Sequence, residues 1–330
     1  MRPLLAAVLA LAALGTSGAV AEPTAEGYAI EIVRKDGAIF SGLARSGDDL
    51  LVTDLGNGGF YRLGSDRRFI PFGPTLPHGP DVIGDPTGPY AIAPHGGNFL
   101  VAQGWTPVDS DEGPHDHALL EIDATSVVRV IHADFWNPFR FRIADDSVYV
   151  VDSGRNSIER LTFDGEKKTV FSFQRLKQKP DAMQSLSPTE FSGQSLYEVD
   201  AVPTGLLIED KRLYVSLFGG FPFAAGAGQV VSMGLAGQEP QIDVSGLNAP
   251  VDLAIVDNTI FILEHGIYDQ ATGFQPGSGR LIAFDNMHGR RAVIVDGLTR
   301  PVSLLVSATG EIAISELGGA LYFLKPKPAN

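Results

Sequence analysis

Four acidic residues each end a short apolar segment that is predicted to be a β-strand. Carboxylate oxygens are the ligands that Ca²⁺ prefers in proteins. One hypothesis is therefore a ring of oxygen ligands for a hard cation such as Ca²⁺, made by Asp54, Asp152, Glu264, Glu316 and the more internal Asp252. The alternative is that each acid accepts backbone N–H groups of the turn that follows it, which Asp residues commonly do.

A second candidate is the loop 109–117, which holds four acids and two histidines within nine residues. These side chains are suitable metal ligands, but their spacing matches neither an EF-hand loop nor a zinc motif. A solvated acidic loop is the simpler interpretation.

The segment 218–226 differs, because it is aromatic, rich in glycine and uncharged. An exposed apolar loop is costly unless it packs or binds, so it predicts either a binding surface or a hydrophobic plug.

An internal repeat of about fifty residues predicts how these residues are positioned. A proline followed by an apolar strand recurs at positions 89, 138, 203, 250 and 301, with steps of 49, 65, 47 and 51. A polar turn and a second strand follow each start, and the first copy lacks the proline. The predicted second strands are 50–54, 99–103, 148–152, 213–217, 260–264 and 312–316. Repeats of this length with several strands are typical of β-propellers.

Third and fourth strands complete the first five repeats, whereas the sixth repeat ends before a fourth strand. The segment 28–33 alternates as a half-buried strand does and is left over at the N-terminus. We therefore predict an all-β, six-bladed β-propeller over 22–330, closed by the N-terminal strand completing the last blade. A pair of β-sandwiches is the runner-up, but it explains neither the even spacing nor the spare strand.

The long insertions are predicted to lie on one face of the wheel. In an up-and-down blade, the loop between strands two and three and the loop to the next blade share a face. The insertions 104–117, 218–228 and 265–278 belong to the first class, and 73–88 and 174–202 to the second. Long loops on a rigid scaffold carry function. The candidate ligand-binding residues on this face are Trp105, Phe221, Pro222, Phe223, Glu264, His265 and Tyr268.

Two charged residues are predicted at the hub, two positions after a repeat proline. Arg140 and Asp252 occupy places where neutral residues would suffice. We include both among the candidate ligand-binding residues, since they could face the central tunnel. A buried ion pair or a solvated channel lining would explain them equally well.

The N-terminal segment and the composition of the chain limit the class of protein. Residues 1–21 read as a secretory signal peptide, with a basic start, an apolar run and an A-x-A site ending at Ala21. The mature chain is therefore expected in the periplasm or outside the cell, as a monomer with no membrane span. The absence of cysteine means that a large core must stabilise the fold without disulfides. A net charge of −14 argues against a nucleic-acid partner.

Two segments resemble the ScyD/ScyE family, which is related to NHL-type propellers and linked to scytonemin biosynthesis in cyanobacteria. The first runs from Asn137-Pro138-Phe139 to the strand and turn at 148–158. The second runs from Val202-Pro203-Thr204-Gly205 to the sequence GFPFAAGA at 220–227. The resemblance is good over 137–233 and thinner elsewhere. It implies an exported propeller, but it supplies no catalytic residues to carry over.

Three functions are compatible with the sequence. The leading hypothesis is an accessory propeller that binds a small molecule or a protein on its loop-bearing face. The alternative is a metal-dependent hydrolase of the gluconolactonase or strictosidine-synthase-like type, with the metal held in the hub. Only Asp252 supplies a carboxylate at the aligned hub positions, and one ligand is too few. A quinoprotein dehydrogenase ranks third, because histidine and arginine are sparse at those positions.

Overall fold

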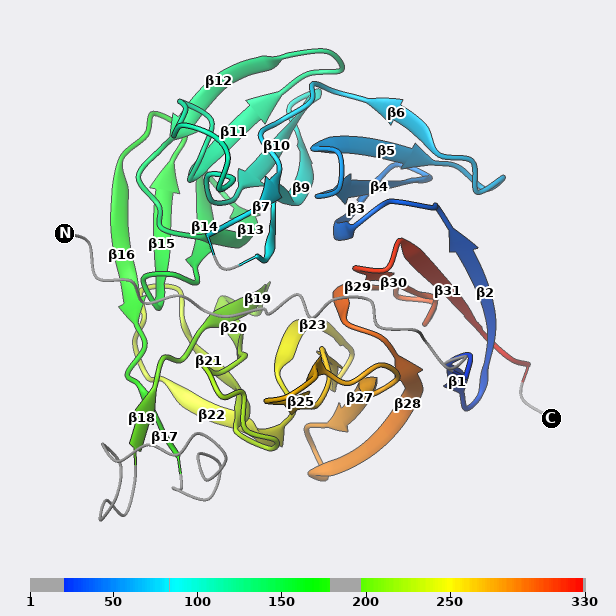
Figure 1. Cartoon of the computed structure of the whole chain (residues 1–330). Coiled ribbons are helices and arrows are strands. Elements are labelled where there is room, and N and C mark those ends of the chain that lie inside the picture. The colour runs from blue at the N-terminus through cyan, green and yellow to red at the C-terminus, as the bar shows by residue number, and fades with distance from the viewer. Residues whose placement is uncertain (1–20, 83, 179–196, 329–330) are drawn as a thin grey trace.

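Six antiparallel sheets of four or five strands surround a central hub in the computed structural model (Figure 1). The structure describes residues 21–82, 84–178 and 197–328, and within these no helix occurs. The prediction of an all-β, six-bladed β-propeller is confirmed. The proposed signal peptide lies outside the described residues, which begin at Ala21.

The first three blades follow the chain order from the hub outward. Each begins with a seven-residue strand and continues through two antiparallel partners to a short outer strand. Their strands are β3 (Phe40–Ser46), β4 (Asp49–Asp54), β5 (Gly59–Leu63) and β6 (Ile70–Phe72); β9 (Pro89–His95), β10 (Asn98–Gln103), β11 (Ala118–Ile122) and β12 (Val127–His132); and β13 (Pro138–Ala144), β14 (Ser147–Asp152), β15 (Ser157–Thr162) and β16 (Lys167–Ser172).

The last three blades repeat this pattern, except at the point where the ring closes. Their strands are β19 (Pro203–Glu209), β20 (Arg212–Leu217), β21 (Gly228–Gly234) and β22 (Gln241–Leu247); β23 (Pro250–Val256), β24 (Thr259–Glu264), β27 (Gly279–Asp285) and β28 (Arg290–Leu298); and β29 (Pro301–Val306), β30 (Ile312–Glu316), β31 (Ala320–Pro326) and β2 (Tyr28–Arg34).

The N-terminal strand closes the ring as the sequence predicted. β2 is the outer strand of blade six and pairs with β31 in the register Ile30↔Leu324. Tyr28, Ile30 and Ile32 pack against the core of that blade. A short extra strand, β1 (Thr24–Ala25), adds a fifth strand to blade five by pairing with β28, which the sequence did not indicate.

The second strands match the predicted ranges closely, whereas the outer strands differ more. β6 begins at Ile70 instead of residue 68, and β12 ends at His132 instead of residue 135. An outer strand has a partner on one side only and is more exposed, so its ends are specified less strongly by apolar pattern.

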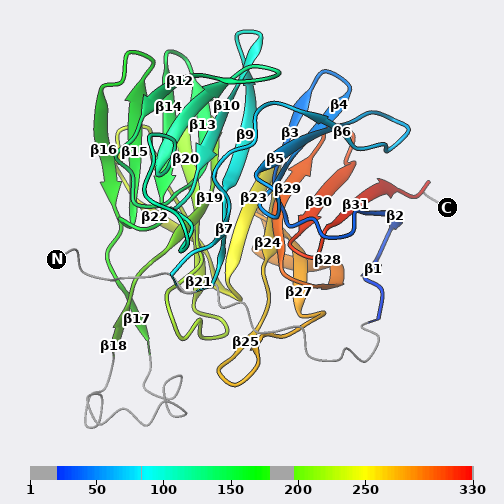
Figure 2. The ribbon, with the colours of Figure 1, turned by 45° about the horizontal axis from the view of Figure 1, so that its top comes forward.

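The insertions lie together on one face of the wheel, which we call the loop face. They contain three small hairpins, whose labelled strands gather at one end of the molecule while tight turns occupy the other (Figure 2). The hairpins are β7 (Gly79–Pro80) with β8 (Pro86–Thr87), β17 (Leu176–Gln178) with β18 (Tyr197–Val199), and β25 (Tyr268–Asp269) with β26 (Gly273–Phe274).

The core consists of apolar layers between neighbouring blades. Phe40 and Leu63 of blade one, for example, belong to the same buried cluster as Leu321 of blade six. Near the hub the first strands approach so closely that two positions require glycine. A Cβ on Gly42 would lie 2.7 Å from the carbonyl oxygen of Tyr90, and one on Gly205 would lie 2.8 Å from Cα of Asp252.

No helix able to cross a bilayer occurs in the part of the chain that the structure describes.

Candidate functional site

The acids that end the second strands hold the segment that enters their own blade. Asp54 Oδ1 accepts hydrogen bonds from the backbone N–H groups of Ile39 and Gly56, both at 2.9 Å. Asp152 accepts from Trp136 at 2.9 Å and Asn137 at 2.8 Å. Burial raises the pKa of Asp152, while the backbone donors act in the opposite direction. Both carboxylates therefore hold in place the segment that leads into their own blade, which we call its linker.

The corresponding residues of blades two, five and six do the same, whereas blade four has Leu217 at this position. Glu264 accepts from the N–H of Asn248 at 2.7 Å and forms a two-nitrogen ion pair with Arg280. Glu316 accepts from the N–H of Thr299 and from the hydroxyl of Tyr322. In blade two, Gln103 donates from Nε2 to the carbonyl oxygen of Pro77.

These contacts explain the positions of the acids without a cation, and the cation ring stays a prediction. Each acid sits in a different blade and is bound to its own linker, because backbone N–H groups left at a strand end need acceptors. Among the described residues, no three His, Asp or Glu side chains converge where they could hold a metal ion. The interpretation as turn acceptors agrees better with these contacts, although most of the backbone N–H donors precede the blade and, of the backbone donors named here, only Gly56 and Arg155 follow the acids.

The acidic loop 109–117 makes hydrogen bonds of its own. Asp116 Oδ2 accepts from the N–H of Gly113 at 2.9 Å, while its Oδ1 is buried without a hydrogen-bond partner among the described residues. Nδ1 of His117 donates to the carbonyl oxygen of Trp136 at 2.9 Å, since a carbonyl oxygen can only accept. One oxygen of Asp116 and one ring nitrogen of His117 thus already have partners, the first within the loop and the second in the linker before blade three.

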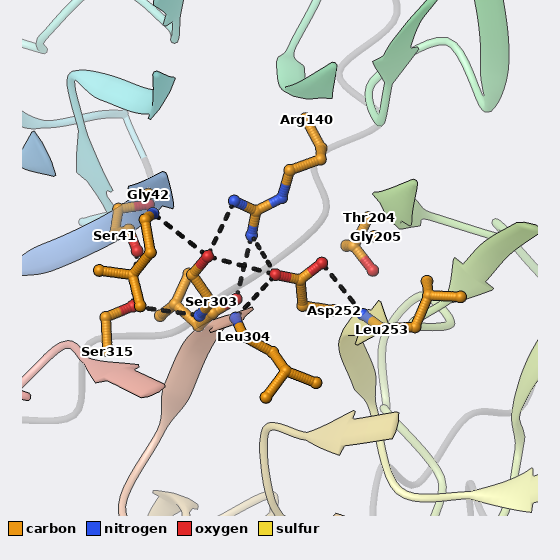
Figure 3. Close-up of polar contacts among 12 residues, drawn as sticks. Ser41, Gly42, Arg140, Thr204, Gly205, Asp252, Leu253, Ser303, Leu304 and Ser315 are labelled. Carbon is orange, nitrogen blue, oxygen red and sulfur yellow. Dashed lines mark hydrogen bonds and ion pairs between the residues drawn. The ribbon is translucent and has the colours of Figure 1, made fainter. Parts of the chain in front are cut away.

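The hub is crossed by a buried ion pair (Figure 3). Nη2 of Arg140 in blade three lies 3.2 Å from Oδ2 of Asp252 in blade five, and both side chains are almost fully buried. Arg140 also donates to Ser303 Oγ and to the carbonyl oxygen of Val302, both at 3.1 Å. Ser303 and Val302 belong to blade six, which faces blade three across the ring. Arg140 therefore spans the central axis.

Both oxygens of Asp252 are engaged within the hub. Besides Arg140, Oδ2 accepts from the N–H of Leu304 at 2.9 Å and the hydroxyl of Ser303 at 3.2 Å, and Oδ1 accepts from the N–H of Leu253 at 3.0 Å. Oδ2, the oxygen that faces Arg140, therefore has no lone pair left for another ligand. Of the three interpretations of Arg140 and Asp252, the structure selects the buried ion pair.

A second layer, closer to the loop face, surrounds a small cavity that we call the hub mouth. The residues just after the repeat prolines and just after the second strands contribute to it. The cavity has a volume of about 20 Å³, which is room for roughly one water molecule. Its lining includes Ser41, Leu55, Tyr90, Phe139, His265 and Arg300.

His265 lines the hub mouth, and both of its ring nitrogens have a neighbour. Nδ1 donates to the carbonyl oxygen of Pro301 at 2.9 Å, in the way that Ser153, the equivalent residue of blade three, donates to Pro203. Nε2 is then an acceptor, and Nε of Arg300 lies 3.4 Å from it. Burial lowers the pKa of His265 to about 3, helped by the charge of Arg300. The imidazole is neutral at any physiological pH.

Arg300 is the cation of the hub mouth. Its side chain is half-buried, and one terminal nitrogen is buried without a hydrogen-bond partner in the described part of the chain. Burial lowers the pKa of Arg300, and the nearby charge of Asp85 acts against that shift. Burial likewise raises the pKa of Tyr90. The mouth thus combines a buried donor, a neutral acceptor and an apolar wall.

Aromatic side chains from blades four and five form one wall beside the mouth. Phe223 is 4 % exposed and contacts Phe218, Tyr268 and Phe274 with ring centroids 5.0–5.7 Å apart. Phe221 is only half-buried and lies 6.0 Å from both Phe223 and Tyr268. The peptide bond before Pro222 is cis. The loop 218–226 is therefore partly a plug, through Phe223, and partly an accessible surface, through Phe221 and Tyr268.

Trp105 lies apart from this aromatic wall. Its carbonyl oxygen accepts from the hydroxyl of Thr87 at 2.8 Å, and its indole Nε1 is buried without a partner in the described residues. No ring contact between Trp105 and the wall occurs there. Of the predicted ligand-binding residues, the structure brings together Phe221, Phe223, His265 and Tyr268, and it assigns Arg140, Asp252 and Glu264 to ion pairs.

Sequence reasoning missed Tyr90 and Arg300. Both flank a repeat proline, Tyr90 immediately after Pro89 and Arg300 immediately before Pro301. A comparison of the residues beside each proline would have found them, since most of the other repeats have small or apolar side chains there. The repeat instead predicted hub residues two positions after each proline, and these residues form the deeper layer that contains the ion pair.

Solved structures share the fold at low sequence identity. A gluconolactonase from Xanthomonas campestris is 12% identical with a TM-score of 0.58, covering 90% of this chain and 89% of its own. A Thermus thermophilus protein described as an oxidoreductase of the glucose dehydrogenase type is 15% identical with a TM-score of 0.58, covering 90% and 100%. Virginiamycin B lyase from Staphylococcus aureus is 11% identical with a TM-score of 0.51, covering 90% and 99%.

No protein-family model matches the chain, and no curated protein matches it in sequence. At such identities the structural likeness establishes the propeller fold alone.

Proposed function

We propose that this chain is a binding protein whose hub mouth takes a small, partly apolar molecule carrying a carbonyl or carboxylate group. The observation that supports this most directly is the buried nitrogen of Arg300, which has no partner among the described residues. A buried donor without an acceptor is costly, and a ligand oxygen would remove that cost. A guanidinium also suits carboxylate geometry better than other side chains do.

The wall of the mouth supports the apolar part of the ligand. Phe221 and Tyr268 are half-buried and stack edge to face, and Tyr268 contacts Phe274, whose ring also contacts His265. Small-molecule sites commonly combine such a wall with a few placed polar groups. The cavity itself accommodates only the acceptor group, so the body of the ligand lies over Phe221 and Tyr268. A recessed site of this kind fits a small molecule better than a protein surface.

Two observations favour binding over hydrolysis in the hub. Asp252, the only hub carboxylate expected from the repeat, is already engaged by Arg140 and three other donors. His265 is a poor general base, because its pKa of about 3 lies far from the value near neutrality that such a base needs. The alternative hydrolase predicts turnover of sugar lactones with Ca²⁺ or Zn²⁺; we expect none, with or without either metal.

Export is part of the proposal and is supported by the pattern of residues 1–21 alone. Expression of the full chain in a bacterium should yield a periplasmic product whose mass corresponds to a start at Glu22. A cytoplasmic product that retains Met1 would contradict export. The relation to the ScyD/ScyE family likewise stays a prediction.

A thermal-shift screen with aromatic acids and their amides tests the binding function. At least one compound should raise the melting temperature of the wild-type protein. The same compound should have little effect on Arg300→Gln and on Phe221→Ala, each compared with its own ligand-free melting temperature. Arg290→Gln is the matched control, because Arg290 is largely exposed and pairs with Asp285 at the rim. Hits that stabilise Arg300→Gln as well as wild type would contradict the proposal.

A further inference from the structure

A cleft of about 410 Å³ opens at the loop-face end of blade three, separate from the hub mouth. Its size lies within the range of small-molecule sites, which hold about 300–1,000 Å³. Its residues come from β15, β16, the turn before β15, and the two linkers on either side of the blade. The lining includes Trp136, Arg155, Ser157, Glu159, Arg175 and Asp200.

Glu159 lines the cleft and is a buried carboxylate without a neutralising cation among the described residues. It is 2% exposed and makes no ion pair within the described part of the chain. Its only side-chain partners there are hydroxyls: Ser157 donates to Oε1 at 2.7 Å and Thr169 to Oε2 at 2.9 Å. Burying a carboxylate without a cation is costly, so a structural role alone is a weak reason to keep one. Each oxygen retains capacity to accept another hydroxyl.

The cations of the cleft are already neutralised. Arg155 pairs with Asp134 at 2.9 Å, and its guanidinium lies 5.6 Å above the ring of Trp136. Arg175 pairs with Asp200 at 3.1 Å and is half exposed. An anionic ligand would therefore meet no free positive charge and would face Glu159. A ligand of hydroxyl groups, by contrast, can donate to Glu159 and Asp200 and accept from the two guanidinium groups.

We propose that this cleft binds a neutral saccharide, a second ligand site independent of the hub mouth. A sugar hydroxyl is both a donor and an acceptor, so a saccharide can donate to the carboxylates of the cleft and accept from its guanidinium groups. The half-buried indole of Trp136 provides an apolar surface for the C–H face of the ring.

The chain contains two tryptophans, and of these only Trp136 lines the cleft, so Trp105 serves as an internal reference. Trp136 lines the cleft, and Trp105 lies in the blade-two insertion. In Trp105→Phe, the emission of Trp136 should change in a saturable way on titration with at least one of glucose, galactose, mannose, maltose and cellobiose. In Trp136→Phe, the same sugars should leave the emission of Trp105 unchanged.

Glu159→Gln in the Trp105→Phe background tests the role of the carboxylate. It keeps the shape of the side chain and should weaken sugar binding by about tenfold or more, since hydrogen bonds to charged groups are the stronger ones. Its melting temperature shows whether the blade is intact. Glu121→Gln is the matched control, since Glu121 is a partly buried carboxylate of blade two that pairs with Arg129.

Three results would overturn the proposal: no saturable change with any of these sugars, equal affinity in folded Glu159→Gln, or a response confined to glucuronate or glucosamine.

Discussion

Arg140 and Asp252 join blades three and five through a contact of 3.2 Å that crosses the hub of the propeller. The same guanidinium reaches Ser303 and Val302 in blade six. The guanidinium of Arg140 thus connects blades three, five and six across the hub (Figure 3). The ion pair lies in a structural layer of the hub, and the layer that we propose to bind a ligand lies closer to the loop face.

Removing one member of this pair should destabilise the fold strongly. Asp252→Asn and Arg140→Met should each lower the free energy of unfolding by about 3–5 kcal/mol, because the partner charge stays buried. Urea denaturation followed by circular dichroism measures the change. The double variant Arg140→Met/Asp252→Asn should recover part of the loss. Single variants that cost less than about 1 kcal/mol, the range of an exposed ion pair, would show that the pair is solvated.

Ring closure by β2 should be essential to cooperative folding. Deleting residues 22–34 removes β2 and leaves one edge of β31 unpaired along its whole length. An exposed edge of this kind promotes aggregation, so the truncated protein should aggregate or melt without a sharp transition. Deleting residues 22–26 removes only β1 and should preserve a cooperative transition. A longer deletion that melts at the wild-type temperature would disprove closure by β2.

The sequence predicted the blades well because their pattern depends on local features. A repeat proline, a polar turn and an alternating second strand recur with even spacing, and the register of each hairpin follows from them. The spare strand 28–33 was predicted from the absence of a partner in the sixth repeat. Each of these signals lies within one repeat or at the two ends of the chain.

The hub could not be predicted in the same way, because every first strand has an irregular register where it meets the tunnel. The pairing shifts between Pro138 and Arg140, between Pro250 and Asp252, and between Pro301 and Ser303. A bulge changes the direction of the side chains on either side of it. The sequence therefore suggested charges at the hub but did not show that Arg140 meets Asp252, or that Arg300 lies beside His265.

His265 should make stability depend on pH in a mildly acidic range. The folded protein keeps the imidazole neutral down to a pKa of about 3, whereas the model value for an unperturbed histidine is 6.5. Between these values the unfolded chain binds a proton that the folded chain does not. Stability is therefore lost as pH falls from 6.5 toward 3, with a contribution of roughly 1.4 kcal/mol per pH unit from this residue.

Urea denaturation of His265→Gln between pH 6 and pH 4 measures this contribution. The variant should lose stability more gradually with falling pH than the wild-type protein does, by about 1 kcal/mol per pH unit. His288→Gln is the control, since His288 is exposed at the rim and pairs there with Asp285, so it should change the slope much less than His265→Gln does. Parallel curves for wild type and His265→Gln would mean that His265 is accessible to protons in the folded state.

Phe223 and Phe221 should separate the two roles of the aromatic loop. Phe223→Ala removes a ring that is 4% exposed and should cost about 3–5 kcal/mol of stability. Phe221→Ala removes a half-buried ring and should cost less than half as much, while weakening ligand binding. Thermal melts of both variants give the comparison. Equal costs would assign the whole loop to the plug and would remove Phe221 from the binding surface.

The most direct test of the binding site is a calorimetric titration of the best aromatic acid from the thermal-shift screen into wild type and Arg300→Gln. Hydrogen bonds to charged groups are worth about 1.5–3 kcal/mol, which corresponds to a loss of about 10- to 150-fold in affinity. We predict a loss in this range for Arg300→Gln and an unchanged dissociation constant for the exposed-rim variant Arg290→Gln. Equal affinity in wild type and Arg300→Gln would contradict the assignment of the hub mouth as the ligand site.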